Sequence, residues 1–266
     1  MRSLKIINEY GQSIKLTGKV LINGIEGLGI TRENEYLAFR DRYSLARINH
    51  GLGDISLGIV FLEGYSGYKE FVLFISRATK LFLEYKTNET YLCKIAFKEI
   101  TKGEISFGSL QSNLTIVKLS PWYRNSEFAL EVSTTESDKE FPYVYYYTYG
   151  ANANGSMQIT NSGDSDAYLT LKIIGRMKNP YVLVNKNGET IGTFRLFYEG
   201  EDIVSMSSVP DDEYIKVADE NAYQLQDFTC KNFLTIPKGE SEIVFYPGTS
   251  DPATCYLKIE ESFEGV

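Results

Sequence analysis

Short runs of alternating apolar and polar residues, separated by glycine, asparagine, aspartate and serine, recur along most of the chain. In one such run Leu81, Leu83 and Tyr85 share one side of an extended strand, and residues 92–100 alternate in the same way. The turn-forming residues 87–89 lie between the two runs, which predicts a β-hairpin. The 20 Tyr and 15 Phe residues also favour strands. We therefore expect a mainly β protein.

One segment departs from this alternation. From 67 to 79 the apolar residues Tyr68, Phe71, Val72 and Ile75 follow one another at i, i+3, i+4 and i+7. This is the spacing of one face of an amphipathic α-helix. The sequence therefore predicts a single helix that leads into the strand at Leu81.

A change of character after residue 123 indicates a domain boundary. Residues 124–127 are polar and residues 134–140 are polar and acidic. We expect domains at 1–127 and 128–266. The first is predicted to be β-sandwich-like with one helix and a hairpin. Turn-punctuated short strands in the second predict a jelly-roll β-sandwich, with expected strands at 128–132, 143–149, 156–161, 168–174, 181–184, 190–197, 233–236, 243–246 and 255–260.

The charge and the rare residue types argue against most catalytic chemistry. With 27 Lys and Arg against 35 Asp and Glu, the net charge is −8, which disfavours a surface that follows phosphates. Cys93, Cys230 and Cys255 are widely spaced, and His50 is the single histidine, so His- or Cys-based metal sites and acid–base dyads lack partners. No apolar stretch approaches a membrane span. We therefore expect that the protein is not an enzyme and that it binds no cofactor, metal ion, membrane or specific nucleic-acid sequence.

Two alternatives stay open at this point. Tyr145 and Tyr147 lie in an aromatic string (residues 141–149) that could stack sugar rings, although cross-strand packing is the favoured interpretation. A carbohydrate-binding β-sandwich that acts at the host cell surface is therefore the alternative function.

Paired carboxylates could also serve a glycosidase, but the acids lie mainly in turns. Residues 161–166 have calcium-like oxygen spacing, for which a β-turn is preferred.

The order of several short motifs resembles one protein family. The first half contains Gly67-Tyr68-x-x-Phe71, Leu81-x-Leu83-x-Tyr85 and Leu119-Ser120-Pro121-Trp122-Tyr123. The second half contains Ile159-Thr160-Asn161-x-Gly163-Asp164, Lys172-Ile173-x-Gly175, Asn179-Pro180 and Ile236-Pro237-Lys238-Gly239-Glu240-Ser241-x-Ile243. This pattern is similar to distal tail proteins of long-tailed phages and prophages of Gram-positive bacteria.

The resemblance implies a structural baseplate protein of the virion. It implies that the N-terminal domain forms a hexameric ring, and that a galectin-like C-terminal sandwich projects from it. The ring would join the tail tube protein to the tail-tip hub protein and would dock receptor-binding proteins for host attachment, after synthesis in the host cytoplasm. Residues 28–63 and 92–107 are the candidates for the ring contact. Structural positions implied by the motifs are Gly67, Tyr68, Phe71, Leu83, Tyr85, Pro121, Trp122, Tyr123, Asn161, Gly163, Gly175, Asn179 and Pro180. We expect the core of the N-terminal domain to contain the helix face (Tyr68, Phe71, Val72 and Ile75) and Pro121-Trp122-Tyr123.

Overall fold

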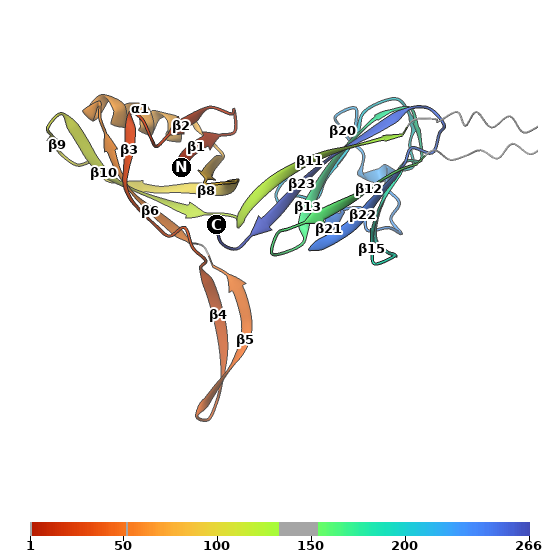
Figure 1. Cartoon of the computed structure of the whole chain (residues 1–266), viewed down its shortest axis with the longest axis horizontal. Coiled ribbons are helices and arrows are strands. Elements are labelled where there is room, and N and C mark those ends of the chain that lie inside the picture. Colours follow the sequence, from red (N-terminus) through yellow and green to blue (C-terminus); the bar gives the residue numbers. More distant parts are fainter. Residues whose placement is uncertain (1, 52, 133–153) are drawn as a thin grey trace, which may run out of the picture. The chain divides into compact units, whose positions relative to one another are not determined.

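The chain forms two compact units in the computed structural model, which describes residues 2–51, 53–132 and 154–266 (Figure 1). Unit 1 comprises Met1–Arg124 and Phe263–Val266, and unit 2 comprises Asn125–Ser262. The first unit thus contains the last four residues of the sequence. Both units consist mainly of antiparallel strands, which confirms the expected mainly β fold.

Unit 1 is built around a strongly curved set of strands. The order β2-β1-β7-β8 continues from β8 to β10, and then to β6 and β3. Strand β9 pairs with β10, and β4 and β5 form a separate two-stranded sheet. The elements are β1 (Ser3–Asn8), β2 (Ser13–Lys15), β3 (Val20–Glu26), β4 (Arg32–Phe39), β5 (Arg42–His50), β6 (Asp54–Phe61), α1 (Gly64–Arg77), β7 (Leu81–Lys86), β8 (Thr90–Ile100), β9 (Ile105–Ser106), β10 (Ser109–Lys118) and β11 (Trp122–Val132), whose later part belongs to unit 2.

The core of unit 1 lies between the strands and α1. Alternate residues of β6 and β10 point inward and are buried, and so are Leu4 and Ile6 of β1. The rings of Phe61 on β6 and Phe71 on α1 meet edge-on with centroids 5.5 Å apart. Aromatic pairs in this geometry add about 0.5–1.5 kcal/mol to the free energy of area burial.

The predicted helix and hairpin are both present. Helix α1 begins three residues before the expected start, and it buries Phe71 and Ile75 from the predicted face. Strands β7 and β8 pair in antiparallel register, with Leu83 opposite Cys93. The expected inner face of β7 is buried throughout. On β8 the expected inner face ends early, because Phe97 is exposed.

Unit 2 is a sandwich of two antiparallel sheets around one core. One sheet has the order β11-β23-β13-β18-β19-β20 with β21 beside β13, the other has the order β12-β22-β15-β16, and β14 pairs with β17. The elements are β12 (Gly155–Asn161), β13 (Ala167–Gly175), β14 (Met177–Lys178), β15 (Tyr181–Lys186), β16 (Glu189–Arg195), β17 (Glu199–Gly200), β18 (Val204–Ser207), β19 (Tyr214–Val217), β20 (Glu220–Asn221), the 3₁₀ turn η1 (Tyr223–Leu225), β21 (Thr235–Ile236), β22 (Gly239–Tyr246) and β23 (Ala253–Phe263).

Each expected strand of unit 2 that lies in the described residues overlaps an observed strand, but some bounds differ. The strand expected at 233–236 is limited to Thr235–Ile236, the one at 190–197 ends at Arg195, and the one at 243–246 begins at Gly239. The strand expected at 143–149 lies outside the described residues. No strand was expected at β14, β17, β18, β19 or β20, each of which is two to four residues long. Within the described ranges, no helix is long and apolar enough to cross a membrane.

Candidate assembly interface

The most unusual part of unit 1 is the hairpin of β4 and β5, which we call the arm. It extends away from the rest of the unit (Figure 1), and β4 and β5 pair with each other from Arg32↔His50 to Phe39↔Arg42. All eight residues of β4 are exposed. A two-stranded hairpin without a packing layer is marginally stable in water. An arm of this kind therefore needs a partner surface.

The pairing register divides the arm into two faces. Directly opposed residues of an antiparallel pair point to the same side, so Tyr36 lies beside Leu45, and Ala38 lies beside Tyr43. A bulge between Glu35 and Tyr36 shifts the pairing register by one residue. Beyond it, Asn34 and Ile48 lie on the same side of the arm as Tyr36 and Leu45. One side, which we call the apolar face, carries Asn34, Tyr36, Ala38, Tyr43, Leu45 and Ile48; the other carries Glu33, Glu35, Leu37, Phe39, Arg42, Ser44 and Arg47.

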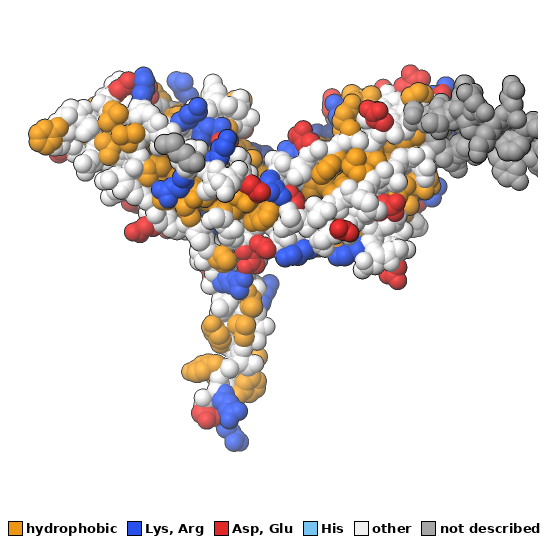
Figure 2. Space-filling view, viewed as in Figure 1, with side chains coloured by type: hydrophobic (Ala, Val, Ile, Leu, Met, Phe, Trp, Pro, Cys, Tyr) orange, Lys and Arg blue, Asp and Glu red, His pale blue; other side chains and the backbone are white. Residues whose placement is uncertain are grey.

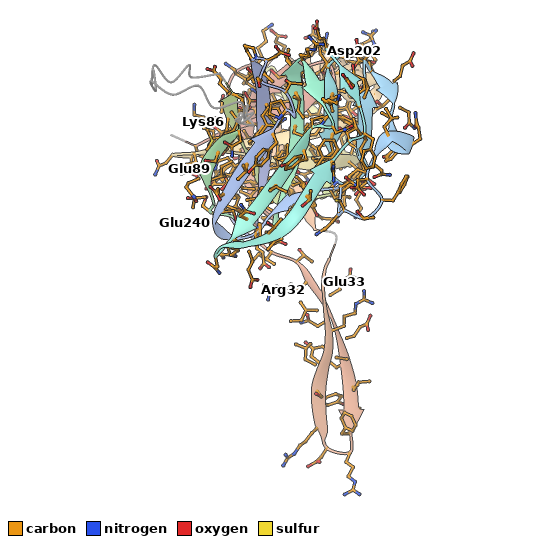
Figure 3. All side chains as sticks on the ribbon, turned by 90° about the vertical axis from the view of Figure 1, so that its right-hand side faces the viewer. Arg32, Glu33, Lys86, Glu89, Asp202 and Glu240 are labelled. Atoms are coloured by element: carbon orange, nitrogen blue, oxygen red, sulfur yellow. The ribbon has the colours of Figure 1, made fainter. Side chains whose placement is uncertain are left out.

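The apolar face exposes large side chains in one place. Tyr36 is 59% and Tyr43 79% exposed, and Leu45 and Ile48 are about half exposed. Figure 2 shows hydrophobic side chains along the arm, and Figure 3 shows side chains standing out from both of its faces. With an aromatic side chain taken as ~200 Å², the two tyrosines leave roughly 280 Å² in water, and covering that area contributes up to ~7 kcal/mol.

Backbone carbonyls hold the root of the arm against the body of unit 1. The indole Nε1–H of Trp122 donates to the Leu28 carbonyl at 3.1 Å. The Lys118 Nζ donates to the Gly29 carbonyl, and the Lys118 backbone N–H donates to the Gly53 carbonyl at 2.8 Å. Trp122 is 1% exposed, so the rigid core of the unit extends to the first residue of β11. These contacts fix the direction in which the arm leaves.

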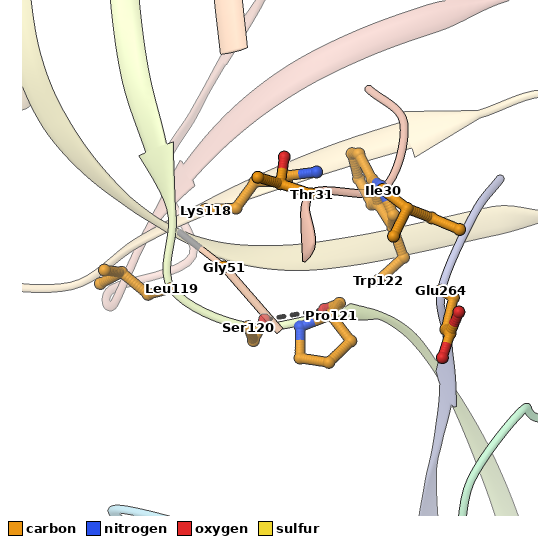
Figure 4. Close-up of a pocket in the computed structure, with 9 residues that line it drawn as sticks. All are labelled: Ile30, Thr31, Gly51, Lys118, Leu119, Ser120, Pro121, Trp122 and Glu264. Atoms are coloured by element: carbon orange, nitrogen blue, oxygen red, sulfur yellow. Dashed lines mark hydrogen bonds between the residues drawn. The ribbon is translucent and has the colours of Figure 1, made fainter. Parts of the chain in front are cut away.

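A small hollow of about 120 Å³ lies at this root (Figure 4). Arg32 at the start of the arm forms an ion pair with Glu264 at the edge of the hollow. Partial burial lowers the pKa of the Lys118 ammonium group. Ligand pockets are usually about 300–1,000 Å³, so this hollow is a packing gap beside the arm and too small for a substrate site.

Gly27 makes the turn into the arm possible. Its φ is +87°, in the left-handed region, and a Cβ there would lie 2.0 Å from the Asp54 carbonyl oxygen. Any other residue would push β3 away from the start of β6. The arm root therefore depends on a glycine that no motif singled out.

The family-motif residues of the first half fall into the core of unit 1. Phe71 and Leu83 are buried, Tyr85 is 8% exposed, and Tyr68 meets the ring of Phe61 edge-on at 5.7 Å. Gly67 is half-buried on α1, where a Cβ would make only ordinary contacts with Glu63 and Phe61.

The motif around Trp122 divides into buried and exposed residues. Trp122 and Tyr123 are buried, and the Trp122 ring lies 5.9 Å from that of Tyr85. Pro121 is exposed, which corrects the expectation that it belongs to the core. It lines the hollow at the arm root, where the chain turns from β10 into β11.

The motif residues of the second half shape turns of unit 2. The Asn161 side chain is buried and closes the loop 161–166 by accepting from Gly163 N–H at 2.9 Å and donating to the Ser165 and Ile236 carbonyls. These bonds make the segment a structural turn. Gly175 has φ +123°, and a Cβ there would meet the Pro252 carbonyl at 2.6 Å.

The remaining two motif residues form the next bend, where Asn179 has φ +49° and is exposed while Pro180 is buried. The candidate glycan contacts Tyr145 and Tyr147 lie outside the described residues. The arm residues Tyr36 and Tyr43 were singled out by no motif. In the sequence, they were marked only by lying in a stretch (residues 36–48) that contains several aromatic and aliphatic residues.

Comparison with known proteins agrees with this architecture. Residues 3–119 match the family model of the distal tail protein, N-terminal domain. No match was found among curated proteins.

Solved structures match the fold over the whole chain. A chain of the phage P2 baseplate, in its activated conformation with calcium, has a TM-score of 0.70 at 17% identity, with 100% of both chains covered. The strontium-bound form of the phage p2 baseplate matches with a TM-score of 0.69 at 15% identity. The SPP1 Dit protein, described as a paradigm of the hub adsorption apparatus in phages infecting Gram-positive bacteria, matches with a TM-score of 0.64 at 10% identity and covers 97% of this chain and 98% of its own.

The family match over residues 3–119 and these folds over the whole chain thus both indicate a likeness to phage tail and baseplate proteins. They are in keeping with a structural, non-enzymatic protein.

Proposed function

We propose that this chain is a distal tail protein that forms a ring of six copies through unit 1, and that the ring joins the tail tube protein to the tail-tip hub protein. Unit 2 then offers a β-sandwich on which receptor-binding components dock during host attachment. The chain is made in the cytoplasm of the host bacterium and works in the virion. The division into a ring-forming domain at 1–127 and a docking domain at 128–266 belongs to this proposal.

The arm is the observation that carries the proposal. Each copy presents an apolar face with Tyr36 and Tyr43 largely exposed, and among the described residues β4 pairs with no strand other than β5. Head-to-tail contacts between different patches of identical subunits close into rings when the rotation allows it. A ring covers every arm and leaves no apolar face in water. Of the two candidate ring contacts, residues 28–63 are favoured because they contain the arm.

Light scattering on the purified full-length chain tests the ring. The proposal predicts a mass near 181 kDa, which is six times 30.1 kDa. A mass of 30.1 kDa at every concentration would contradict it.

A matched pair of variants then tests the arm. The double variant Tyr36→Ser, Tyr43→Ser removes two aromatic anchors, and each buried anchor at an interface centre contributes about 2 kcal/mol or more. We expect it to be monomeric at the concentration at which the wild type is a ring. The control Leu37→Ser, Phe39→Ser changes the other face of the same arm and should keep the ring. A ring in the first variant would show that the apolar face is not the contact.

A further inference from the structure

Unit 1 has a second apolar surface, separate from the arm. It is a groove of about 370 Å³ between the C-terminal half of α1 and strands β7 and β8, and its apolar lining includes Val72, Ile75, Leu81, Ile95, Phe97 and Leu119. Phe97 is 40% and Leu119 56% exposed. An apolar cavity of about 150 Å³ holds one benzene ring, so this groove has room for about two aromatic rings.

The polarity of the groove matches the arm. Its lining contains no charged side chain, and its polar members are two hydroxyl residues, Ser76 and Thr79. Beyond Arg32 at the root, the apolar face of the arm carries no charged residue, and it carries two tyrosines. A tyrosine buries its ring among apolar groups and keeps its hydroxyl near a polar partner. Ser76 and Thr79 lie at the helix side of the groove, on α1 and just after it.

The arm does not fill its own groove. It extends away from α1 in Figure 1, and the contacts of Trp122 and Lys118 at the root hold it in that direction. A closed ring needs two different, complementary patches on every subunit. Unit 1 carries two such patches, one projecting and one recessed, and in the described part of the chain both are exposed.

We propose that the groove between α1 and β8 receives Tyr36 and Tyr43 from the arm of a second copy of this chain. This inference rests on the proposed ring and specifies its contact. Each subunit inserts its arm into one neighbour and accepts the arm of the other neighbour. The rotation that relates one subunit to the neighbour holding its arm then determines how many copies close the ring.

Disulfide trapping between two different variants tests this contact in the full-length chain. Both carry Cys230→Ser, because Cys93 and Cys255 are buried and Cys230 is partly exposed. One variant is Tyr43→Cys on the apolar face. The other is Ser76→Cys at the exposed edge of the groove. The two are mixed, subunits are exchanged, and a mild oxidant is added.

The expected result is a disulfide-linked dimer that forms in the mixture only. At about 10 µM protein it should form about 100-fold faster than random collision allows, because partners in contact meet at millimolar effective concentration. Two controls fix the geometry. Ser44→Cys lies on the other face of the arm, and Ser66→Cys is an exposed serine at the opposite end of α1. Neither should cross-link above the collision rate when it replaces its counterpart.

The outcomes separate this inference from the proposed function. A wild-type mass of six copies with no mixed disulfide overturns the groove assignment and leaves the ring standing. Rapid cross-linking of Tyr43→Cys with itself shows arm-to-arm pairing and also overturns the groove assignment. A monomeric wild type overturns both.

Discussion

Trp122 connects the core of unit 1 to the arm, so its replacement should weaken both. The side chain is 1% exposed, its ring lies 5.9 Å from that of Tyr85, and its Nε1–H donates to the Leu28 carbonyl. Trp122→Ala removes this packing and leaves a cavity, which costs about 3–5 kcal/mol in other cores. A domain of this size has about 5–15 kcal/mol in total, so the variant should retain only part of its stability.

Scanning calorimetry measures this effect without relying on fluorescence, which the variant loses because Trp122 is the single tryptophan. A change of 3–5 kcal/mol lowers the midpoint of a domain of this size by roughly 10–25 °C. The transition of unit 2 serves as the internal control, because Trp122 belongs to unit 1. A midpoint for unit 1 within about 3 °C of the wild type would refute the reasoning, since ~1 kcal/mol or less would then be lost.

Trp122→Phe separates the hydrogen bond from the packing. It keeps an aromatic ring in the core and removes the donor to the Leu28 carbonyl, which should cost about 1 kcal/mol. Limited trypsin digestion then reports on the arm, whose tip carries Arg40 and Arg42. We expect faster cleavage there in Trp122→Phe than in the wild type. Equal cleavage rates would show that the indole bond does not hold the arm root.

Three further predictions concern single contacts away from Trp122. Glu9 accepts hydrogen bonds from the Thr79 N–H and hydroxyl, which lower its pKa from 4.5 to about 2. The contribution of Glu9 to stability is therefore present above pH 4.5 and is lost as the pH falls toward 2. Between pH 7 and 3, the calorimetric midpoint of Glu9→Gln should fall less than that of the wild type. Asn161→Ala leaves buried backbone groups unpaired and should destabilise unit 2 by about 2–4 kcal/mol in urea unfolding; no change would mean that water replaces the amide. Gly27→Ala should destabilise unit 1 by more than ~1 kcal/mol because its Cβ meets the Asp54 carbonyl, and an unaltered midpoint would contradict the strained turn.

Sequence periodicity predicted elements that bury one face. The spacing of Tyr68, Phe71 and Ile75 located α1, and alternation located β7 and β8, because in each case a buried face shapes the pattern. The start of α1 was missed by three residues because its N-cap residue Glu63 makes no side-chain cap. No capping signal exists there to be read.

The arm could not be predicted because neither of its faces is buried by the residues that the structure describes. Its alternation is blurred by Leu37 and Phe39 on the charged face and by the bulge near Tyr36. Its turn, at Arg40 and Asp41, has φ +54° at Arg40 and contains neither glycine nor asparagine. The hairpin therefore lacks both the regular alternation and the turn-forming residues that ordinarily indicate a hairpin in a sequence.

The contacts at the arm root were equally hidden from the sequence. The buried position of Trp122 was expected, but its bond to Leu28 spans 94 residues. Local patterns carry no information about such a pairing. Pro121 was misplaced for the same reason, since the turn beside the arm root, which the sequence did not reveal, puts it at the surface.

Electron microscopy of the purified particle tests the central claim most directly. The account predicts class averages with sixfold rotational symmetry, in which density for β4 and β5 of each copy (residues 32–50) crosses onto the α1 side of its neighbour. Particles without rotational symmetry, or a ring in which every arm ends free in solvent, would contradict it.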